Sequence, residues 1–179
     1  LSELIRDNCN FTDLKPKHRM RYQVPWGKHI PFRYRGKHDT GLPKFNGMVH
    51  SDTLPVVAVR DPYTWMQSMC LQPYAAQYDH DKSKCPNIVP YESDIEAHPR
   101  FAKMKYIPVN VKYDKEIRIK YESMAHFWNE WYSDYIRFEN DNKTMVSPLD
   151  FPFIVVRMED LIFHADTVIP IMCECGGGK

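Results

Sequence analysis

The sequence lacks any uninterrupted apolar run of about 18 residues, the length that a membrane-spanning helix needs. It also lacks an excess of charge, because 24 Lys and Arg stand against 23 Asp and Glu and leave a net charge of +1. We therefore expect no membrane span within the chain and no nucleic-acid partner. What is present is 43% apolar residues over 179 positions, which is typical of one globular domain.

The cysteines lack the spacing of a zinc site, since no Cys-x-x-Cys pair occurs, and we expect no metal. Their odd number cannot pair completely, which favours mostly free or buried thiols. Two Asn-x-Thr sequons, at Asn10 and Asn142, give some support to a secretory location, and the compartment stays open between the cytoplasm and the Golgi lumen. The cysteines are Cys9, Cys70, Cys85, Cys173 and Cys175.

Two compact β-branched runs, Leu54–Val59 and Phe151–Arg157, are typical of strands buried on both faces of a parallel sheet. Helical patterns alternate with them, and this alternation predicts an α/β fold with a mainly parallel sheet. One helix is expected to begin after Asp61, a good N-cap, with Pro62 in its first position. The expected helices are Leu1–Cys9, Asp61–Leu71, Arg118–Phe138 and Asp160–Cys175.

The remaining segments are rich in residues that interrupt regular structure. Tyr22–Trp26 fits a short extended segment, whereas Gly27–Asp52 is rich in Gly, Pro and His and is expected to form a long loop. Residues 72–117 fit an irregular insertion with short helical turns. We treat residues 1–179 as a single domain.

The segment Val56–Ser68, VVAVRDPYTWMQS, combines a buried strand that ends in Arg60 with a capped helix that carries Ser68. In open α/β sheets, ligands bind beyond the carboxyl ends of the strands, where Arg60 is expected. A guanidinium holds a phosphate through two parallel hydrogen bonds, and Ser68 would add a neutral donor. From the residues alone, the alternative is an arginine paired with Asp61 or another carboxylate, beside a surface serine.

This segment resembles the 3′-phosphate-binding segment of the sulfotransferases, in which a strand ends in Arg and a Ser follows eight residues later, as Arg60 and Ser68 do here. The resemblance implies a three-layer α/β/α fold of the P-loop NTPase type. It also implies 3′-phosphoadenosine 5′-phosphosulfate (PAPS) as the sulfuryl donor. The acceptor would be a hydroxyl or amine of a small molecule or glycan, and no metal would be needed.

A second segment, Trp26–Phe32 (WGKHIPF), is similar to the family's Lys-x-His-Leu-Pro motif. His29 falls on the histidine, which in cytosolic members is the general base that deprotonates the acceptor hydroxyl. Histidine suits this role because its unperturbed pKa of about 6.5 lies near the working pH. Gly27 stands where the family has Lys, and membrane-bound members use Glu as the base. From the residues alone, the alternative is a loop histidine bonded to backbone.

A third segment, MEDL starting at Met158, fills the place of the family's Tyr/Phe-Glu-Asp-Leu motif. Its expected role is structural. Glu159 or Asp160 would cap a helix, and Leu161 would pack together with Ile162.

The opening helix Leu1–Cys9 resembles the helix that directly follows the family's Gly-rich phosphate loop, and this sequence holds no such loop. The terminal GGGK is no substitute, because no Ser/Thr and no helix follow it. We therefore expect a fragment, truncated at both ends, that is itself inactive.

Two stretches offer alternatives for the acceptor site. The aromatic residues of one expected helix either line an acceptor pocket or form core; they are Phe127, Trp128, Trp131 and Tyr132. The loop Arg33–Lys44 either binds an anionic acceptor such as a sulfated glycan or is a solvated basic loop.

Two other functions stay open. One is a non-catalytic nucleotide- or anion-binding protein of the same fold, favoured by Gly27 in place of Lys and by the missing loop. The other is a P-loop kinase, which needs a Walker-type loop and acidic Mg²⁺ ligands. Only Arg60-Asp61 loosely resembles a strand that ends in such an acidic residue.

Overall fold

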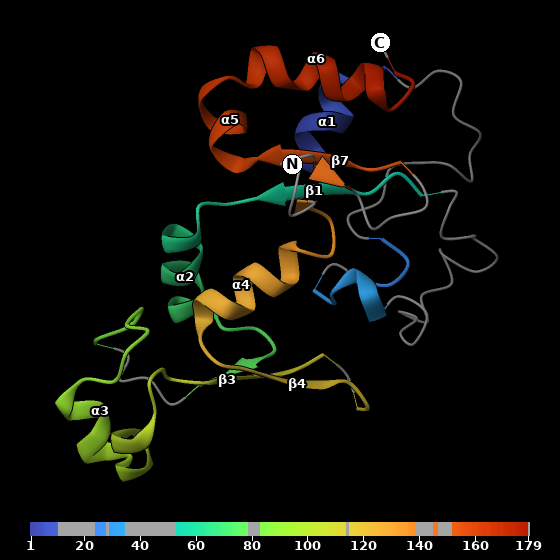
Figure 1. The fold of residues 1–179 in the computed structure, drawn as a ribbon. Helices are drawn as coiled ribbons and strands as arrows, with labels where there is room; N and C mark the ends of the chain where they lie inside the picture. The colour runs from blue at the N-terminus through green and yellow to red at the C-terminus, as the bar shows by residue number, and fades with distance from the viewer. Residues whose placement is uncertain are drawn as a thin grey trace. The chain divides into compact units, whose positions relative to one another are not determined.

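The computed structural model describes residues 1–10, 24–27, 29–34, 53–78, 83–113, 115–138, 145–146 and 152–178. The chain divides into two compact units, of which the first is Leu1–Arg60 with Tyr135–Lys179 and the second is Asp61–Asp134. Helices and strands occur in both units, so the protein is α/β (Figure 1). The strands form a small parallel sheet and two antiparallel sheets. The expectation of a single domain stays a prediction.

The first unit contains a pair of parallel strands, β1 (Val56–Val59) and β7 (Ile154–Arg157). The register sets Val59 opposite Arg157, so both strands end at the same edge. This pairing confirms the two predicted strands, although each begins slightly later than the sequence suggests. Three helices lie on one side of the pair (Figure 1), namely α1 (Ser2–Asn8), α5 (Met158–Phe163) and α6 (Ala165–Cys175).

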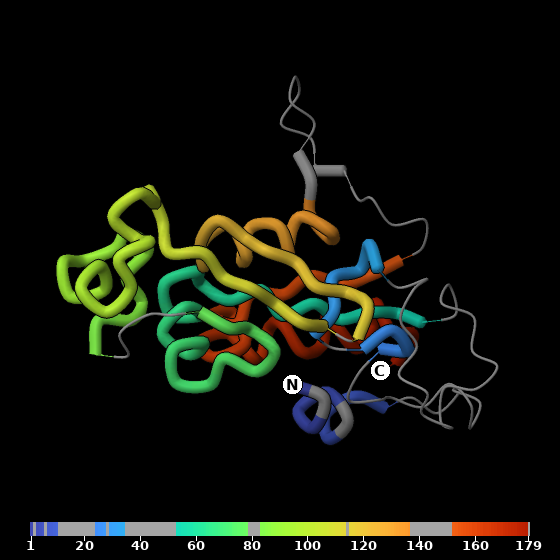
Figure 2. Tube along the Cα trace, turned by 90° about the horizontal axis from the view of Figure 1, so that it is seen from below, coloured from blue at the N-terminus to red at the C-terminus, as the bar shows by residue number. Residues whose placement is uncertain are grey.

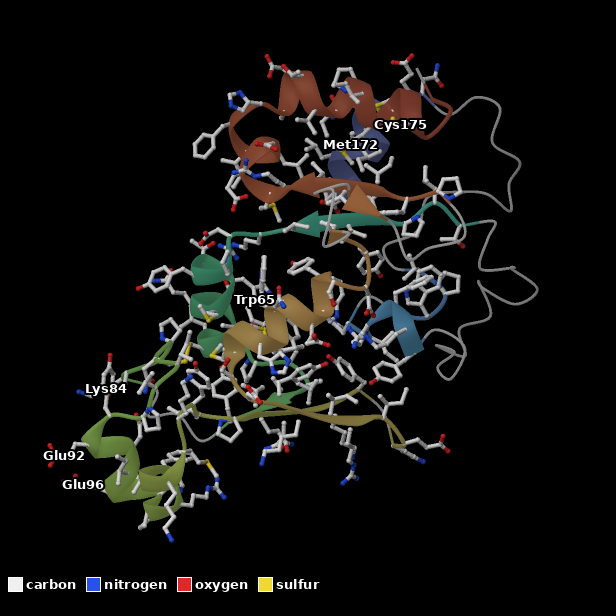
Figure 3. The ribbon with its side chains drawn as sticks, in the orientation of Figure 1. Trp65, Lys84, Glu92, Glu96, Met172 and Cys175 are labelled. Carbon is white, nitrogen blue, oxygen red and sulfur yellow. A yellow bond between two sulfur atoms is a disulfide. The ribbon has the colours of Figure 1, made fainter. Side chains whose placement is uncertain are left out.

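Apolar side chains from these helices and strands form the core of the first unit. Ile5 of α1, Val156 of β7 and Met172 of α6 are all buried, and Met172 is labelled in Figure 3. Full burial of a side chain of this size stabilises the fold by roughly 1.5–3 kcal/mol. The helix predicted over Leu1–Cys9 is confirmed by α1. The unit also holds η2 (Phe32–Tyr34), β5 (Arg137–Phe138) and β6 (Met145–Val146).

The single helix predicted over Asp160–Cys175 is wrong, because α5 and α6 are separate. His164 interrupts them with φ −138° and ψ 34°, outside the helical region. The end of α6 follows the prediction, since Gly177 has φ +76°, a conformation that glycine adopts without steric cost. The Gly178 N–H then donates to the Cys173 carbonyl at 2.8 Å, which satisfies a carbonyl at the end of the helix.

The second unit contains an antiparallel sheet of strand order β2-β3-β4. In Figure 2 the yellow strands of this sheet run alongside the orange helix α4. Its buried core includes Met66, Val109, Tyr121 and Phe127, drawn from both helices and strands. Its elements are α2 (Pro62–Leu71), β2 (Ala76–Gln77), α3 (Glu92–Ala97), η5 (Pro99–Lys103), β3 (Val109–Lys112), β4 (Arg118–Tyr121) and α4 (Met124–Tyr132).

The helix predicted over Arg118–Phe138 is wrong at both ends. Its first residues form β4, in which exposed and more buried side chains alternate. The helix α4 begins only after Ser123, whose hydroxyl oxygen accepts a hydrogen bond from the His126 N–H at 3.1 Å. The extended segment predicted at Tyr22–Trp26 is also wrong in its described part, where Val24 accepts from the Gly27 N–H in a turn.

Two disulfides overturn the expectation of mostly free thiols. Cys9 bonds to Cys173 within the first unit, and the two residues are separated by 164 positions. Cys70 bonds to Cys85 within the second unit, across 15 positions. Cys175 is exposed and is a free thiol (Figure 3). The five cysteines therefore form two disulfides and leave one free thiol, and each unit contains one disulfide.

Candidate functional site

Arg60 lies directly after the last residue of β1, at the carboxyl end of the parallel pair. This is the edge at which open α/β sheets bind ligands. The Arg60 side chain is half-buried, a setting in which a guanidinium is partly shielded from water. The structure therefore agrees with the sequence that Arg60 stands at the carboxyl end of this strand.

The helix that follows Arg60 begins as predicted. Asp61 is its N-cap, and a carboxylate oxygen accepts a hydrogen bond from the Thr64 N–H at 2.9 Å. Pro62 occupies the first helical position, where the missing N–H costs nothing. The Asp61 carboxylate thus has a structural role in holding the start of α2.

Ser68 lies on α2 and is half-buried. Its hydroxyl donates to the Thr64 carbonyl at 3.1 Å, one turn earlier in the helix. To donate to a phosphate instead, the hydroxyl must give up this bond and turn its hydrogen toward the ligand. Arg60 and His29 belong to the first unit and Ser68 to the second, so each is described within its own unit.

His29 is exposed, but the residues on either side of it are fixed. Trp26 and Ile30 are buried, and so is Phe32. The Trp26 and Phe32 rings meet edge to face with centroids 5.3 Å apart, and Phe32 meets Tyr135 at 5.8 Å. These aromatic contacts anchor a short loop that presents the imidazole to solvent, where it can exchange protons.

Gly27 has φ +92°, a conformation that residues with a Cβ rarely adopt. The sulfotransferase-like motif has a lysine at this position, and a lysine would be strained here. The structure thus gives a physical reason for the departure from that motif. Lys28, the neighbouring lysine, lies outside the described residues.

The MEDL segment has a structural role, but it differs from the one expected. Neither Glu159 nor Asp160 caps α5; both lie in its first turn, where acidic side chains interact favourably with the helix dipole. Leu161 is buried in the core of the first unit, as expected. Ile162 is 65% exposed, so the expectation that it packs with Leu161 is wrong.

The aromatic residues of α4 belong mainly to the core. Phe127 is buried and stacks on Tyr121 with ring centroids 4.8 Å apart. Trp131 packs against the same core. This result favours the core interpretation over an aromatic acceptor pocket. Of the basic loop Arg33–Lys44, Arg33 and Tyr34 are described, and the rest lies outside the described residues.

Arg157 is a cation at this edge that the sequence did not single out. It ends β7 opposite Val59 and is 68% exposed. Its Nε atom lies 3.9 Å from the Glu159 carboxylate. The sequence contains a pattern that could have identified Arg157, because this residue follows an apolar run in the same way as Arg60 does. The exposed ion pair makes Arg157 a useful comparison for Arg60.

Comparison of the chain with known protein families, curated proteins and solved structures gives no match. No described helix has the length and apolar character needed to cross a membrane. Among the described residues, no group of three His, Cys, Asp or Glu side chains is arranged to hold a metal ion. The features that point to a function are therefore the residues at the carboxyl end of β1, whose pattern resembles the sulfotransferases.

Proposed function

We propose that this chain is a sulfotransferase-like domain with a three-layer P-loop NTPase type of fold that binds PAPS as a sulfuryl donor. The observation that carries the proposal is the chain order at Arg60. A parallel strand ends, the arginine follows at once, and Asp61 then caps a helix. A guanidinium in this position suits an anionic ligand, and Arg binds phosphate with two hydrogen bonds of defined geometry.

In the proposed reaction, the acceptor oxygen or nitrogen attacks the sulfur in line with the bond to the donor phosphate. That S–O bond breaks, and adenosine 3′,5′-bisphosphate leaves. The acceptor proton passes to the imidazole of His29, the general base. Arg60 and Ser68 hold the 3′-phosphate, so they contribute to donor binding. The scheme requires no metal.

The disulfides bear on where such a protein would work. Disulfides persist in oxidising compartments and are rare in the cytosol. The Cys9–Cys173 and Cys70–Cys85 bonds therefore favour the lumenal location over the cytoplasmic one. A lumenal location would expose the protein to glycan acceptors.

Replacing Arg60 with alanine is expected to weaken binding of adenosine 3′,5′-bisphosphate by more than ~10-fold, because a charged hydrogen bond contributes about 1.5–3 kcal/mol. Isothermal titration calorimetry of the Arg60→Ala variant of the intact natural protein measures this effect directly.

The matched control is Arg157→Ala, which removes a cation from the same edge of the parallel pair. Its exposed pair with Glu159 adds little, so we expect binding to change by less than ~3-fold. Equal affinities of the Arg60→Ala and unmodified chains would rule out Arg60 as the phosphate ligand.

A second function, anion binding without turnover on the same fold, is favoured by Gly27. Its φ of +92° disfavours the lysine of the sulfotransferase motif. This alternative shares the predicted effect at Arg60. The two functions differ in the role of His29. A general base is needed for sulfuryl transfer, and anion binding alone needs none.

A further inference from the structure

The sheet of the second unit has one apolar face and one polar face. The apolar face packs on the core, and its buried residues include Ala76, Val111 and Tyr121. Alternation along each strand sends the next residues to the opposite face. These residues are all exposed, and all carry nitrogen-bearing side chains: Gln77, Asn110, Lys112, Arg118 and Lys120.

The register of β3 and β4 brings like charges together on this face. Lys112 lies directly opposite Arg118, and the next pair on the same face is Asn110 opposite Lys120. Like charges directly opposite each other destabilise a sheet. Figure 3 shows nitrogen-ended side chains extending from β3 and β4 on the side away from α4. The arrangement therefore has an electrostatic cost that a bound anion would remove.

These side chains line an open hollow of about 310 Å³. Its lining includes the three cations and the amides of Gln77 and Asn110, and none of the lining residues is acidic. Within the described part of the chain, the structure records no ion pair for Lys112, Arg118 or Lys120. The hollow thus combines three cations with hydrogen-bonding amides.

We propose that this hollow binds an acidic glycan chain through its sulfate or carboxylate groups. Neighbouring strands lie about 5 Å apart, and alternate residues of one strand about 7 Å apart. Three cations within about 5–7 Å of their neighbours can contact more than one acidic group of a chain that crosses the sheet. The amides can bond to sugar hydroxyls between them.

Two observations favour a glycan over a nucleic acid. No aromatic ring lines the hollow, whereas single-stranded nucleic acids are held largely by stacking of bases on aromatic side chains. The two disulfides favour an oxidising compartment, in which acidic glycans are abundant polyanions. The proposal does not depend on sulfuryl transfer, because it concerns binding alone.

The test is the affinity of the full chain for a heparin-derived hexasaccharide, measured by calorimetry in low salt. The variant Lys112→Gln/Arg118→Gln/Lys120→Gln is expected to bind at least ~10-fold more weakly. Raising the salt concentration should weaken binding to the unmodified chain, since exposed charges are screened. The melting temperature of the variant should not fall, because its substitutions remove repulsion between the strands.

The matched control is Lys84→Gln/Arg100→Gln/Lys103→Gln, which removes the same number of exposed cations from the same unit. This control is expected to bind within ~3-fold of the unmodified chain. Equal losses in the two variants would overturn the proposal, because binding would then depend only on total charge. Tighter binding of a polyuridine strand of matched charge would also overturn it, in favour of a nucleic-acid surface.

Discussion

Replacing His29 with alanine is expected to lower kcat by at least ~100-fold, because general-base catalysis contributes about 10²–10⁴-fold. The loss should fall on turnover and leave the affinity for adenosine 3′,5′-bisphosphate unchanged, since Arg60 and Ser68 are the proposed donor ligands. The measurement is the steady-state rate of sulfuryl transfer by the intact natural protein and by its His29→Ala variant. The affinity for adenosine 3′,5′-bisphosphate is measured in parallel.

The pH profile gives a second readout. A histidine base is active only when neutral, so the rate of the unmodified protein should fall as acid protonates the imidazole. The alanine variant should lose this dependence. Retained turnover would contradict the assignment and move the base elsewhere, for example to an acidic residue in the loop before Leu54. His164→Ala is the control, because His164 is also an exposed histidine of the first unit.

Loss of the Cys9–Cys173 disulfide is expected to lower the free energy of unfolding of the first unit by about 4–5 kcal/mol. In the chain-entropy account, the stabilisation grows with the length of the closed loop, and this bond spans 164 positions. The measurement is urea denaturation of the Cys9→Ala/Cys173→Ala variant against the unmodified chain, with both kept oxidised.

The Cys70→Ala/Cys85→Ala variant is the matched comparison. Its bond spans 15 positions and should contribute about 3 kcal/mol to the second unit. A Cys9 variant that unfolds at the same urea concentration as the unmodified chain would contradict the proposed role of the long-range bond. Peptide mapping without reduction should find both bonds, with Cys175 as the free thiol.

The parts of the fold that local chemistry determines were predictable. β1 is a short β-branched run, and α2 begins with Asp61 and Pro62, which fit the first positions of a helix whatever surrounds them. β7 is a second run of the same kind, and its parallel partner follows from the alternation of strands with helices. Each of these signals lies within a few neighbouring residues.

The predictions from sequence were wrong where the local structure depends on residues far away in the chain. Arg118–Tyr121 contains alternating polar and apolar residues, but only pairing with β3 makes it a strand. The missed strands also concealed the cationic hollow, since its residues share a face only in that register. Cysteine pairing was equally inaccessible, because Cys9 and Cys173 are brought together by the packing of α1 and α6.

The candidate site divides in the same way. The position of Arg60 follows from the strand that precedes it, so it was predictable from the sequence. The turn at Gly27 and the hydrogen bond between Ser68 and Thr64 are geometric facts that no motif contains. Both change the chemistry expected: the first excludes an unstrained lysine, and the second requires the serine hydroxyl to rotate before it binds phosphate.

The most direct test of the central claim compares the binding of two nucleotides to the intact natural protein. Adenosine 3′,5′-bisphosphate and adenosine 5′-monophosphate differ only in the 3′-phosphate that Arg60 and Ser68 are proposed to hold. Calorimetric titration should show at least ~10-fold tighter binding of the bisphosphate, the effect of one charged phosphate contact. Equal affinities for the two nucleotides would contradict the assignment of Arg60 and Ser68 as ligands of the 3′-phosphate, and with it the sulfotransferase-like donor site.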